Sequence, residues 1–294
     1  MSPDAEFALA TRQVEEGGEG LLLLPRRRRS LSNFLTSTVA GFFLFLILLF
    51  LVLPIIVIFP MSFGSASYLE FPPRGLTLNW YRQYLSDPDW RAATFFSVKI
   101  ALATTFSATM VGTLAAIAFA RGKFLGKSLF QALTLSPMII PHIVIAVAVF
   151  IAFSPLNLSG NFFGFLIAHT MLAVPYVVLT VVAALERFDT TLELAALNCG
   201  AGRIRAFFSV VLPNIRVGVA SGAVFAFLAS FDEATVAFFL SGVEGKTITR
   251  KMFEDIDFNL TPVIAAVSVV LTVISLIVMG VLQAFNRATV SAQR

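Results

Sequence analysis

The chain has 294 residues, of which 57% are hydrophobic and 13% are charged, and its mean hydropathy is +0.87. Soluble domains use roughly 45–50% apolar and about 25% charged residues, so the composition excludes an ordinary soluble protein and indicates an integral membrane protein. The net charge of +4 is small and scattered, which argues against a nucleic-acid partner, and the single cysteine, Cys199, permits no disulfide within the chain.

Residues 1–33 have no periodic apolar face of useful length, and glutamate and glycine crowd together between Glu15 and Gly20. A segment of this kind buries too little apolar surface to offset its conformational entropy, so we expect a disordered N-terminal arm. The arginines Arg26–Arg29 lie near its end and precede an apolar run about twice as long as the core of a signal peptide. We therefore expect an uncleaved first membrane helix after the arm.

Six apolar stretches are long enough to cross a bilayer, which takes about 20 mostly apolar residues in a helix. We expect an all-α, polytopic bundle of six membrane helices over residues 34–294, with its core at about 92–286. The six stretches are Phe34–Pro60, Ala92–Ala120, Leu129–Phe153, Phe162–Leu185, Val217–Leu240 and Pro262–Phe285.

An even number of crossings places both ends of the chain on one side of the membrane. Lys and Arg are more frequent in the loops of that side than in the loops of the other, and Arg121, Lys123, Lys127 and Arg187 are among them. Because Lys and Arg concentrate in cytoplasmic loops, we expect both termini, and the N-terminal arm, in the cytoplasm.

Proline occurs within two of the spans, at Pro137 and Pro141 in the third and at Pro175 in the fourth. A proline inside a helix frees a backbone carbonyl and kinks the helix, which a membrane tolerates where neighbouring helices or a cavity satisfy the freed group. The sequence therefore predicts kinks at these depths. Kinks of this kind serve a moving bundle but also occur in static ones, and the sequence leaves both open.

The connection between the fourth and fifth spans, at about residues 186–216, is longer than a simple link requires. Apolar residues recur in it at helical spacing, which predicts two short amphipathic helices. Thr190 and Glu193 have the form of a capping box, Gly200 opens a glycine-rich turn, and Pro213 should end the second helix. The apolar faces comprise Leu192, Ala195, Ala196 and Cys199, and then Ile204, Phe207, Phe208 and Val211.

Two uses of this helical connection are consistent with its pattern. Its apolar faces could pack on the bundle and merely join two spans, or they could form a docking surface for a soluble partner. The second interpretation accounts better for the length of the connection and for its two separate helices.

The run from Glu193 to Ala201, ELAALNCGA, followed by Val211-Leu212-Pro213, resembles the EAA loop of binding-protein-dependent ABC importer permeases. Leu194 stands at the usual glutamate position and Glu193 one residue before it, which leaves the role of Glu193 open. The resemblance implies a type I importer permease whose loop forms coupling helices in a groove of a separate ATPase. The residues that it assigns to this contact are Glu193, Ala195, Ala196, Gly200, Ala201, Leu212 and Pro213.

Shorter motifs resemble the second permease of spermidine/putrescine importers. This resemblance implies a polyamine or related substrate, although opines, phosphonates and other small solutes remain open. It also implies two cytoplasmic ATPase subunits, a second permease expected to be a different chain, an external solute-binding protein, and residence in the bacterial inner membrane. The motifs are LTLNWY at 76–81, IAHT at 167–170, SFDE at 230–233 and FLSG at 239–242.

Asp232 and Glu233 fall within the expected fifth span, where an ionised carboxylate costs at least about 2.5 kcal/mol unless it faces a cavity or a partner. They are therefore candidates for a translocation pathway that attracts a cationic substrate. On one helix they would point about 100° apart, so at most one of them need face the pathway. The alternative places them near the outer end of the helix, either within reach of water or paired with Lys246, Arg250 or Lys99.

Neither a metal site nor a catalytic site is expected. The two histidines, His142 and His169, lack further ligands at metal-binding spacing and are expected to be packed and hydrogen-bonded. Residues 122–128 resemble a phosphate-binding loop, but three residues rather than four separate the glycines and a membrane helix precedes them. We therefore expect no cofactor and no ATP hydrolysis by this chain itself.

Two other classes of protein compete with the importer interpretation. An ion-gradient-driven secondary transporter could use Asp232 and Glu233, but the matched inverted halves typical of that class are not evident in the sequence. A structural membrane subunit without a transport path is the other alternative.

Overall fold

The computed structural model describes residues 31–242, 245–258 and 261–291, and the regular structure in these ranges is helical apart from one isolated β-bridge between Gly64 and Leu76. The chain divides into two units, Met1–Pro54 and Ile55–Arg294. Most of the expected N-terminal arm lies outside the described residues, and the first described helix begins at Leu31.

The first unit holds most of helix α2 (Leu31–Met61). Its segment Thr38–Met61 is apolar enough to cross a membrane and has none of its most apolar window buried. A helix that is apolar on every side is suited to a lipid or protein environment and not to water. The first expected span is confirmed as a helix.

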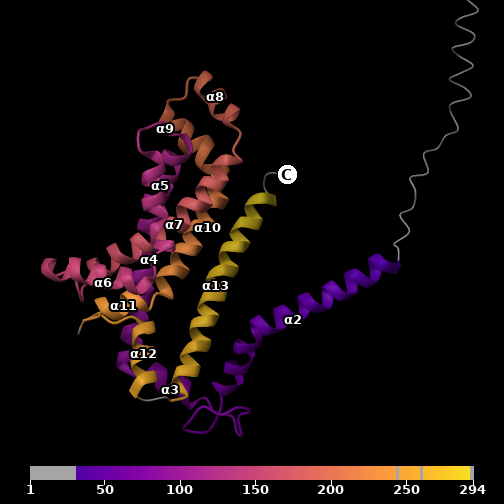
Figure 1. Cartoon of the computed structure of the whole chain (residues 1–294), viewed down its shortest axis with the longest axis vertical. Coiled ribbons are helices and arrows are strands. Elements are labelled where there is room, and N and C mark those ends of the chain that lie inside the picture. The colour runs from indigo at the N-terminus through magenta and orange to yellow at the C-terminus, as the bar shows by residue number, and fades with distance from the viewer. Residues whose placement is uncertain (1–30, 243–244, 259–260, 292–294) are drawn as a thin grey trace, which may run out of the picture. The chain divides into compact units, whose positions relative to one another are not determined.

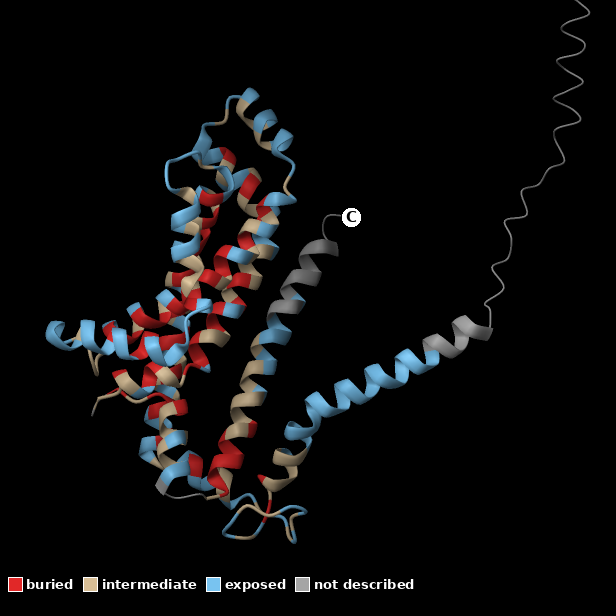
Figure 2. Cartoon of the chain, viewed as in Figure 1, coloured by how far each residue is buried: buried red, intermediate tan, exposed pale blue. Residues whose placement is uncertain are grey.

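The second unit is built around three helices that run side by side, α4 (Pro88–Arg121), α7 (Phe162–Glu186) and α10 (Leu212–Phe231) (Figure 1). Small side chains let them approach closely, since Ala108, Ala116 and Ala173 are completely buried between them. Figure 2 shows the buried residues concentrated along these helices. Helix α7 continues through Pro175, and the second and fourth expected spans are confirmed.

The expected third span is not one straight helix. It consists of α5 (Lys127–Leu135), a short 3-10 turn (Ser136–Met138) and α6 (His142–Phe153), and the two parts are bent by 104°. The predicted effect of Pro137 and Pro141 is thus a full break and not a kink. Proline restricts the residue before it and cannot donate to the preceding turn, so Pro141 starts a helix in a new direction.

The helix that corresponds to the expected fifth span also ends earlier in the structure than the sequence predicts. Helix α10 stops at Phe231, Asp232 is its C-cap, and a separate short helix, α11 (Thr235–Leu240), follows. The prediction that Asp232 and Glu233 lie within a continuous helix is therefore wrong. The side chain of Glu233 accepts a hydrogen bond from the backbone N–H of Val236 at 2.9 Å. It thereby provides an acceptor for one of the N–H groups that have no partner within the first turn of α11.

The end of the second unit opposite to the connection between α7 and α10 is formed by α3 (Asn79–Ser86) and α12 (Ile248–Phe258), from which α13 (Val263–Ser291) runs back (Figure 1). The segment Val263–Val281 of α13 can span a membrane, as expected for the sixth span. The α3–α12 end has its own core, in which Tyr84 and Trp90 pack on Ile248, Val263 and Val267.

The contact between α4 and α7 makes a measurable prediction at Gly112. A methyl group there would lie 2.7 Å from Cβ of Val177, so Gly112→Ala must push the helices apart, at a cost of about 1–3 kcal/mol. Gly280→Ala on α13 is the matched control, because a methyl group at Gly280 meets nothing within 4 Å. Thermal unfolding of the purified protein should show a lower midpoint for Gly112→Ala alone; equal midpoints would contradict the packing.

Candidate functional site

The connection between α7 and α10 begins with a helix whose cap differs from the prediction. Helix α8 (Thr190–Asn198) is capped by Asp189, whose carboxylate accepts the N–H of Thr191 at 2.9 Å. A further hydrogen bond from the Thr191 hydroxyl is the main reason why the pKa of Asp189 is lowered, so this acceptor is ionised at neutral pH. The predicted capping box of Thr190 and Glu193 is therefore wrong, and Glu193 is free for another contact.

The turn after α8 follows the prediction. Gly200 has a φ of +87°, in the left-handed region that glycine enters without strain, and the N–H of Ala201 bonds to the carbonyl of Ala196 at 3.1 Å. Helix α9 (Arg203–Ala206) then runs through a π-helical turn (Phe207–Val211) directly into α10.

Pro213 does not end the second helix, contrary to the prediction. It lies in the first turn of α10, and the helical path is continuous over Arg203–Phe231. The π-helical turn before it changes the hydrogen-bond spacing just where the proline lacks an N–H, and the helix continues past it.

The apolar residues of this connection are largely uncovered. No residue of α8 is buried, and Figure 2 shows α8 as mainly exposed. The connection is held to the bundle by Ala206 and Val211, which are completely buried. The interpretation that α8 merely packs its apolar face on the bundle is therefore wrong. We call the following exposed residues the docking face: Leu192 (47% exposed), Leu194 (57%), Ile204 (77%) and Phe208 (61%).

Glu193 reaches a partner that the sequence did not suggest. Its Oε2 lies 2.5 Å from Nη1 of Arg121, the last residue of α4, and the Arg121 guanidinium also lies over the ring of Phe188 at 5.6 Å. The sequence indicates for Arg121 only a role in setting the orientation of the chain. Because the pair is separated by 72 residues, no local pattern could have indicated it.

The other residues predicted for the connection lie as follows. Gly200 is exposed in the turn, and the α8 residues Ala195 and Ala196 are exposed and half-buried. Ala201, Leu212 and Pro213 are half-buried. The structure thus places these residues along one helical path between α7 and α10.

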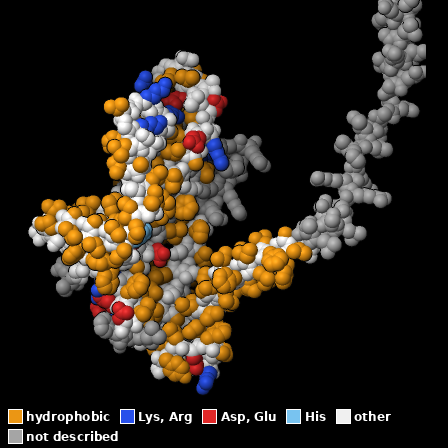
Figure 3. Space-filling view, in the orientation of Figure 1, with side chains coloured by type: hydrophobic (Ala, Val, Ile, Leu, Met, Phe, Trp, Pro, Cys, Tyr) orange, Lys and Arg blue, Asp and Glu red, His pale blue; other side chains and the backbone are white. Residues whose placement is uncertain are grey.

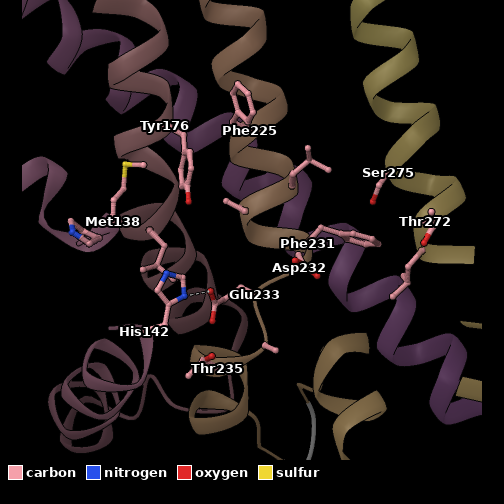
Figure 4. A pocket seen from close by; sticks show the side chains of 16 residues that line it. Met138, His142, Tyr176, Phe225, Phe231, Asp232, Glu233, Thr235, Thr272 and Ser275 are labelled. Carbon is pink, nitrogen blue, oxygen red and sulfur yellow. Dashed lines mark hydrogen bonds and ion pairs between the residues drawn. The ribbon is translucent and has the colours of Figure 1, made fainter. Parts of the chain in front are cut away.

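A cavity of about 660 Å³ lies near the level at which α5–α6 and α10–α11 break (Figure 4). Its wall is mixed, with the rings of Tyr176 and Phe225 stacked at 6.4 Å and hydroxyl groups contributed from other helices. Both Asp232 and Glu233 line it. They can share one cavity because α10 has already ended. The labelled lining residues are Met138, His142, Tyr176, Phe225, Phe231, Asp232, Glu233, Thr235, Thr272 and Ser275.

Glu233 is buried, with 6% of its surface exposed, and its hydrogen-bonding capacity is used within the chain. Its Oε2 lies 2.9 Å from Nδ1 of His142, the first residue of α6, and its Oε1 accepts the Val236 N–H. Its backbone carbonyl accepts the hydroxyl of Thr249 at 3.0 Å. Glu233 therefore joins the two helix breaks, and its side chain stabilises the wall of the cavity.

The predicted pairing of these carboxylates with Lys246, Arg250 or Lys99 is wrong. Lys246 and Arg250 both pair with Glu254, at 2.5 and 3.2 Å. The amino group of Lys99 instead lies 4.6 Å from the centre of the Phe162 ring.

Asp232 differs from its neighbour in being exposed and uncommitted. Its backbone N–H caps α10 by bonding to the carbonyl of Leu228 at 3.0 Å. Within the described residues, its carboxylate makes no hydrogen bond or ion pair, and it lines the cavity. Of the two carboxylates, Asp232 is thus the one available to a solute.

Both histidines are hydrogen-bonded, as expected. His169 is buried, with its Nδ1 2.8 Å from the hydroxyl of Ser230, whereas His142 is the partner of Glu233. Across the described part of the chain, no group of three or more His, Cys, Asp or Glu residues is placed to hold a metal ion.

The fold and the helical connection define a class of transport protein. Residues 108–291 match the family described as the binding-protein-dependent transport system inner membrane component. The chain belongs to this family and is a permease subunit of an ABC importer.

Polyamine permeases are among the curated proteins that are similar to this chain. The spermidine/putrescine permease PotC of Haemophilus influenzae is 31% identical over 245 residues, which cover 83% of this chain and 95% of that protein. PotC of Escherichia coli K12 is 29% identical, covering 81% and 89%, and the putrescine permease PotI of the same strain is 27% identical, covering 74% and 80%. None of these relatives supports an ion-gradient-driven transporter.

Solved structures share the fold. A bacterial ABC transporter involved in alginate import superposes with a TM-score of 0.71 at 18% identity, covering 87% of this chain and 98% of that chain. The MetNI methionine transporter superposes with a TM-score of 0.57 at 14% identity, covering 73% and 99%.

Proposed function

We propose that this permease carries a small organic polycation, of the spermidine and putrescine class or related to it, across the bacterial inner membrane. The observation that carries the proposal is the uncommitted carboxylate of Asp232 in the wall of a 660 Å³ cavity within the helix bundle. The names of the PotC and PotI relatives point to the same class of substrate.

The lining of the cavity suits an ammonium group that has lost part of its water. Asp232 supplies a negative charge, Thr272 and Ser275 supply hydroxyl oxygens, and the faces of Tyr176 and Phe225 supply the negative side of an aromatic ring. Cations are attracted to such ring faces within about 6 Å. An anionic solute would find no described Lys or Arg side chain among the lining residues.

We further propose that the docking face binds a separate cytoplasmic ATPase. The complete transporter has two ATPase subunits, one for each of its two permeases, and this chain does not hydrolyse ATP itself. Clustered exposed apolar side chains mark protein–protein or membrane interaction sites, and we assign those of this connection to a protein partner. The second permease is a different chain in this proposal, and an external solute-binding protein delivers the substrate.

The orientation that goes with this proposal has both termini in the cytoplasm. The basic residues Arg121, Arg187, Arg203 and Arg205 belong to loops and helix ends at the α8–α9 end, where Figure 3 shows Lys and Arg side chains gathered. The positive-inside rule assigns such an end to the cytoplasm.

Co-purification tests the docking proposal. The double substitution Leu194→Asp with Ile204→Asp places charges in the docking face and should weaken ATPase binding by about 2 kcal/mol or more, roughly 30-fold in affinity. Leu125→Asp is the matched control, because Leu125 is fully exposed but lies outside the docking face. The tagged wild-type and control chains should recover the co-expressed ATPase. Equal recovery with the double variant, or none with the wild type, would refute the proposal.

A further inference from the structure

We infer that Arg121 is a positioning residue that holds α8 against the membrane bundle, so that a movement of α8 is passed to α4. This inference rests on the proposed function, because it takes α8 as the helix that the ATPase contacts. It goes beyond that function by giving Glu193 a partner within its own chain, and by assigning a role in coupling to a residue outside the connection of residues 186–216.

Helix α8 has few other attachments. None of its residues is buried, and the bond from Asp189 to Thr191 is local to its own first turn. The turn that follows is open, since nothing lies within 4 Å of a methyl group placed on Gly200. Among the described residues, Glu193 is the α8 residue whose side chain makes an ion pair or hydrogen bond to a membrane helix.

Arg121 is suited to this role by its geometry. Its guanidinium bonds the Glu193 carboxylate at 2.5 Å and also covers the ring of Phe188, which packs on the core between α7 and α10. The Arg121 and Glu193 side chains are 31% and 22% exposed, so the pair is partly withdrawn from water. A planar guanidinium can make a charge-assisted hydrogen bond and stack on a ring at once, which lysine cannot reproduce.

Helix α4 connects this contact to the cavity. It has 34 residues and is therefore about 51 Å long. Near its other end, the Ser97 hydroxyl accepts the N–H of Ile248 in α12 at 2.8 Å, and Ile100 packs with Val236 and Leu240 of α11. Helix α11 follows directly on Asp232 and Glu233. A displacement of Arg121 can thus be transmitted along α4, as one rigid helix, to the cavity wall.

The pair can be removed without unfolding the chain. Partly exposed ion pairs contribute little to the free energy of folding, and the cores around α4 do not involve Glu193. A change in transport on removing the pair would therefore report on coupling.

The test compares three variants: Arg121→Gln, the reversed pair Arg121→Glu with Glu193→Arg, and Lys123→Gln. The last is a control at the same end of the helix bundle. Cys199, the only cysteine in the sequence, is exposed immediately after α8 and accepts a spin label there. The complete transport complex, with cysteine-free partner subunits, is studied in nanodiscs. The readouts are label mobility without nucleotide, bound ATPase, and radiolabelled spermidine taken up per ATP hydrolysed.

With Arg121→Gln we expect a more mobile label and about a tenfold fall in uptake per ATP, with the ATPase still bound. The reversed pair should restore part of both, because it restores the ion pair but not the contact with the Phe188 ring, and Lys123→Gln should match the wild type. If Arg121→Gln matches Lys123→Gln, or if uptake falls while the label is unchanged and reversal does not help, the inference is wrong. A wild-type complex that lacks the ATPase or does not transport spermidine would instead refute the proposed function.

Discussion

Gly200→Val is expected to lower ATP-driven uptake about tenfold or more while the protein remains in the membrane at normal abundance. Gly200 has a φ of +87°, and a side chain with a Cβ costs roughly 1–2 kcal/mol in this region, more when it is β-branched. Nothing lies within 4 Å of the added Cβ, so the loss must come from the turn and not from a clash. The turn sets the direction of α8 relative to α9, and with it the shape of the docking face.

Two substitutions control this experiment. Gly202→Ala also adds a Cβ with nothing within 4 Å, but Gly202 has a φ of −68°, which alanine adopts freely, so uptake should be unchanged. Gly200→Asn should retain much of the activity, because asparagine tolerates the left-handed region. Uptake by vesicles containing the complete complex is the measurement. Normal uptake with Gly200→Val would show that the left-handed turn has no part in coupling.

Asp232→Asn is expected to lower uptake of spermidine at least about tenfold, since it keeps the shape of the side chain and removes the charge that faces the cavity. Desolvating an ammonium group without an opposing charge costs several kcal/mol, and the hydroxyl groups of the cavity compensate only part of it. Because Asp232 is exposed and its carboxylate has no partner in the described residues, thermal stability should not change.

Glu233→Ala is the contrasting variant. It leaves the buried N–H of Val236 without its acceptor and removes the partner of His142, and should lower the free energy of unfolding by about 1–3 kcal/mol. Measuring the thermal unfolding midpoint and the uptake of both variants distinguishes the loss of a charge in the pathway from the loss of hydrogen bonds that support the cavity wall. If Asp232→Asn transports spermidine normally at normal abundance, Asp232 has no role in the pathway.

Much of the architecture is predictable from the sequence because it depends on local composition. Apolar runs such as Phe162–Leu185 leave no alternative to a membrane helix, since backbone groups in hydrocarbon must be satisfied within the segment. The helical connection and its turn at Gly200 follow likewise from spacing and from glycine's conformational freedom. The predicted substrate residues Asp232 and Glu233 do line one cavity, although their separate roles were not apparent.

The errors share a physical cause. Each error concerns where a helix begins or ends. That depends on the path of the backbone and on which acceptor lies close to a free N–H group. The features in question are the continuation through Pro213, the cap at Asp189 and the end of α10 at Phe231. Hydropathy reports the preference of a segment for the membrane, but it does not report where a helix can stop when a side chain replaces its missing backbone bonds.

The sequence by itself determined that the chain is a membrane bundle with a helical connection, because burial in lipid and helical periodicity are properties of contiguous residues. The importer type followed from the resemblance of that connection to the EAA loop. Only the tertiary structure decided that Glu233 is held by His142, that Asp232 stays available, and that Arg121 holds Glu193. These pairs join residues 91 and 72 positions apart. Their partners are chosen by the packing of helices, and packing is a property of the folded chain as a whole.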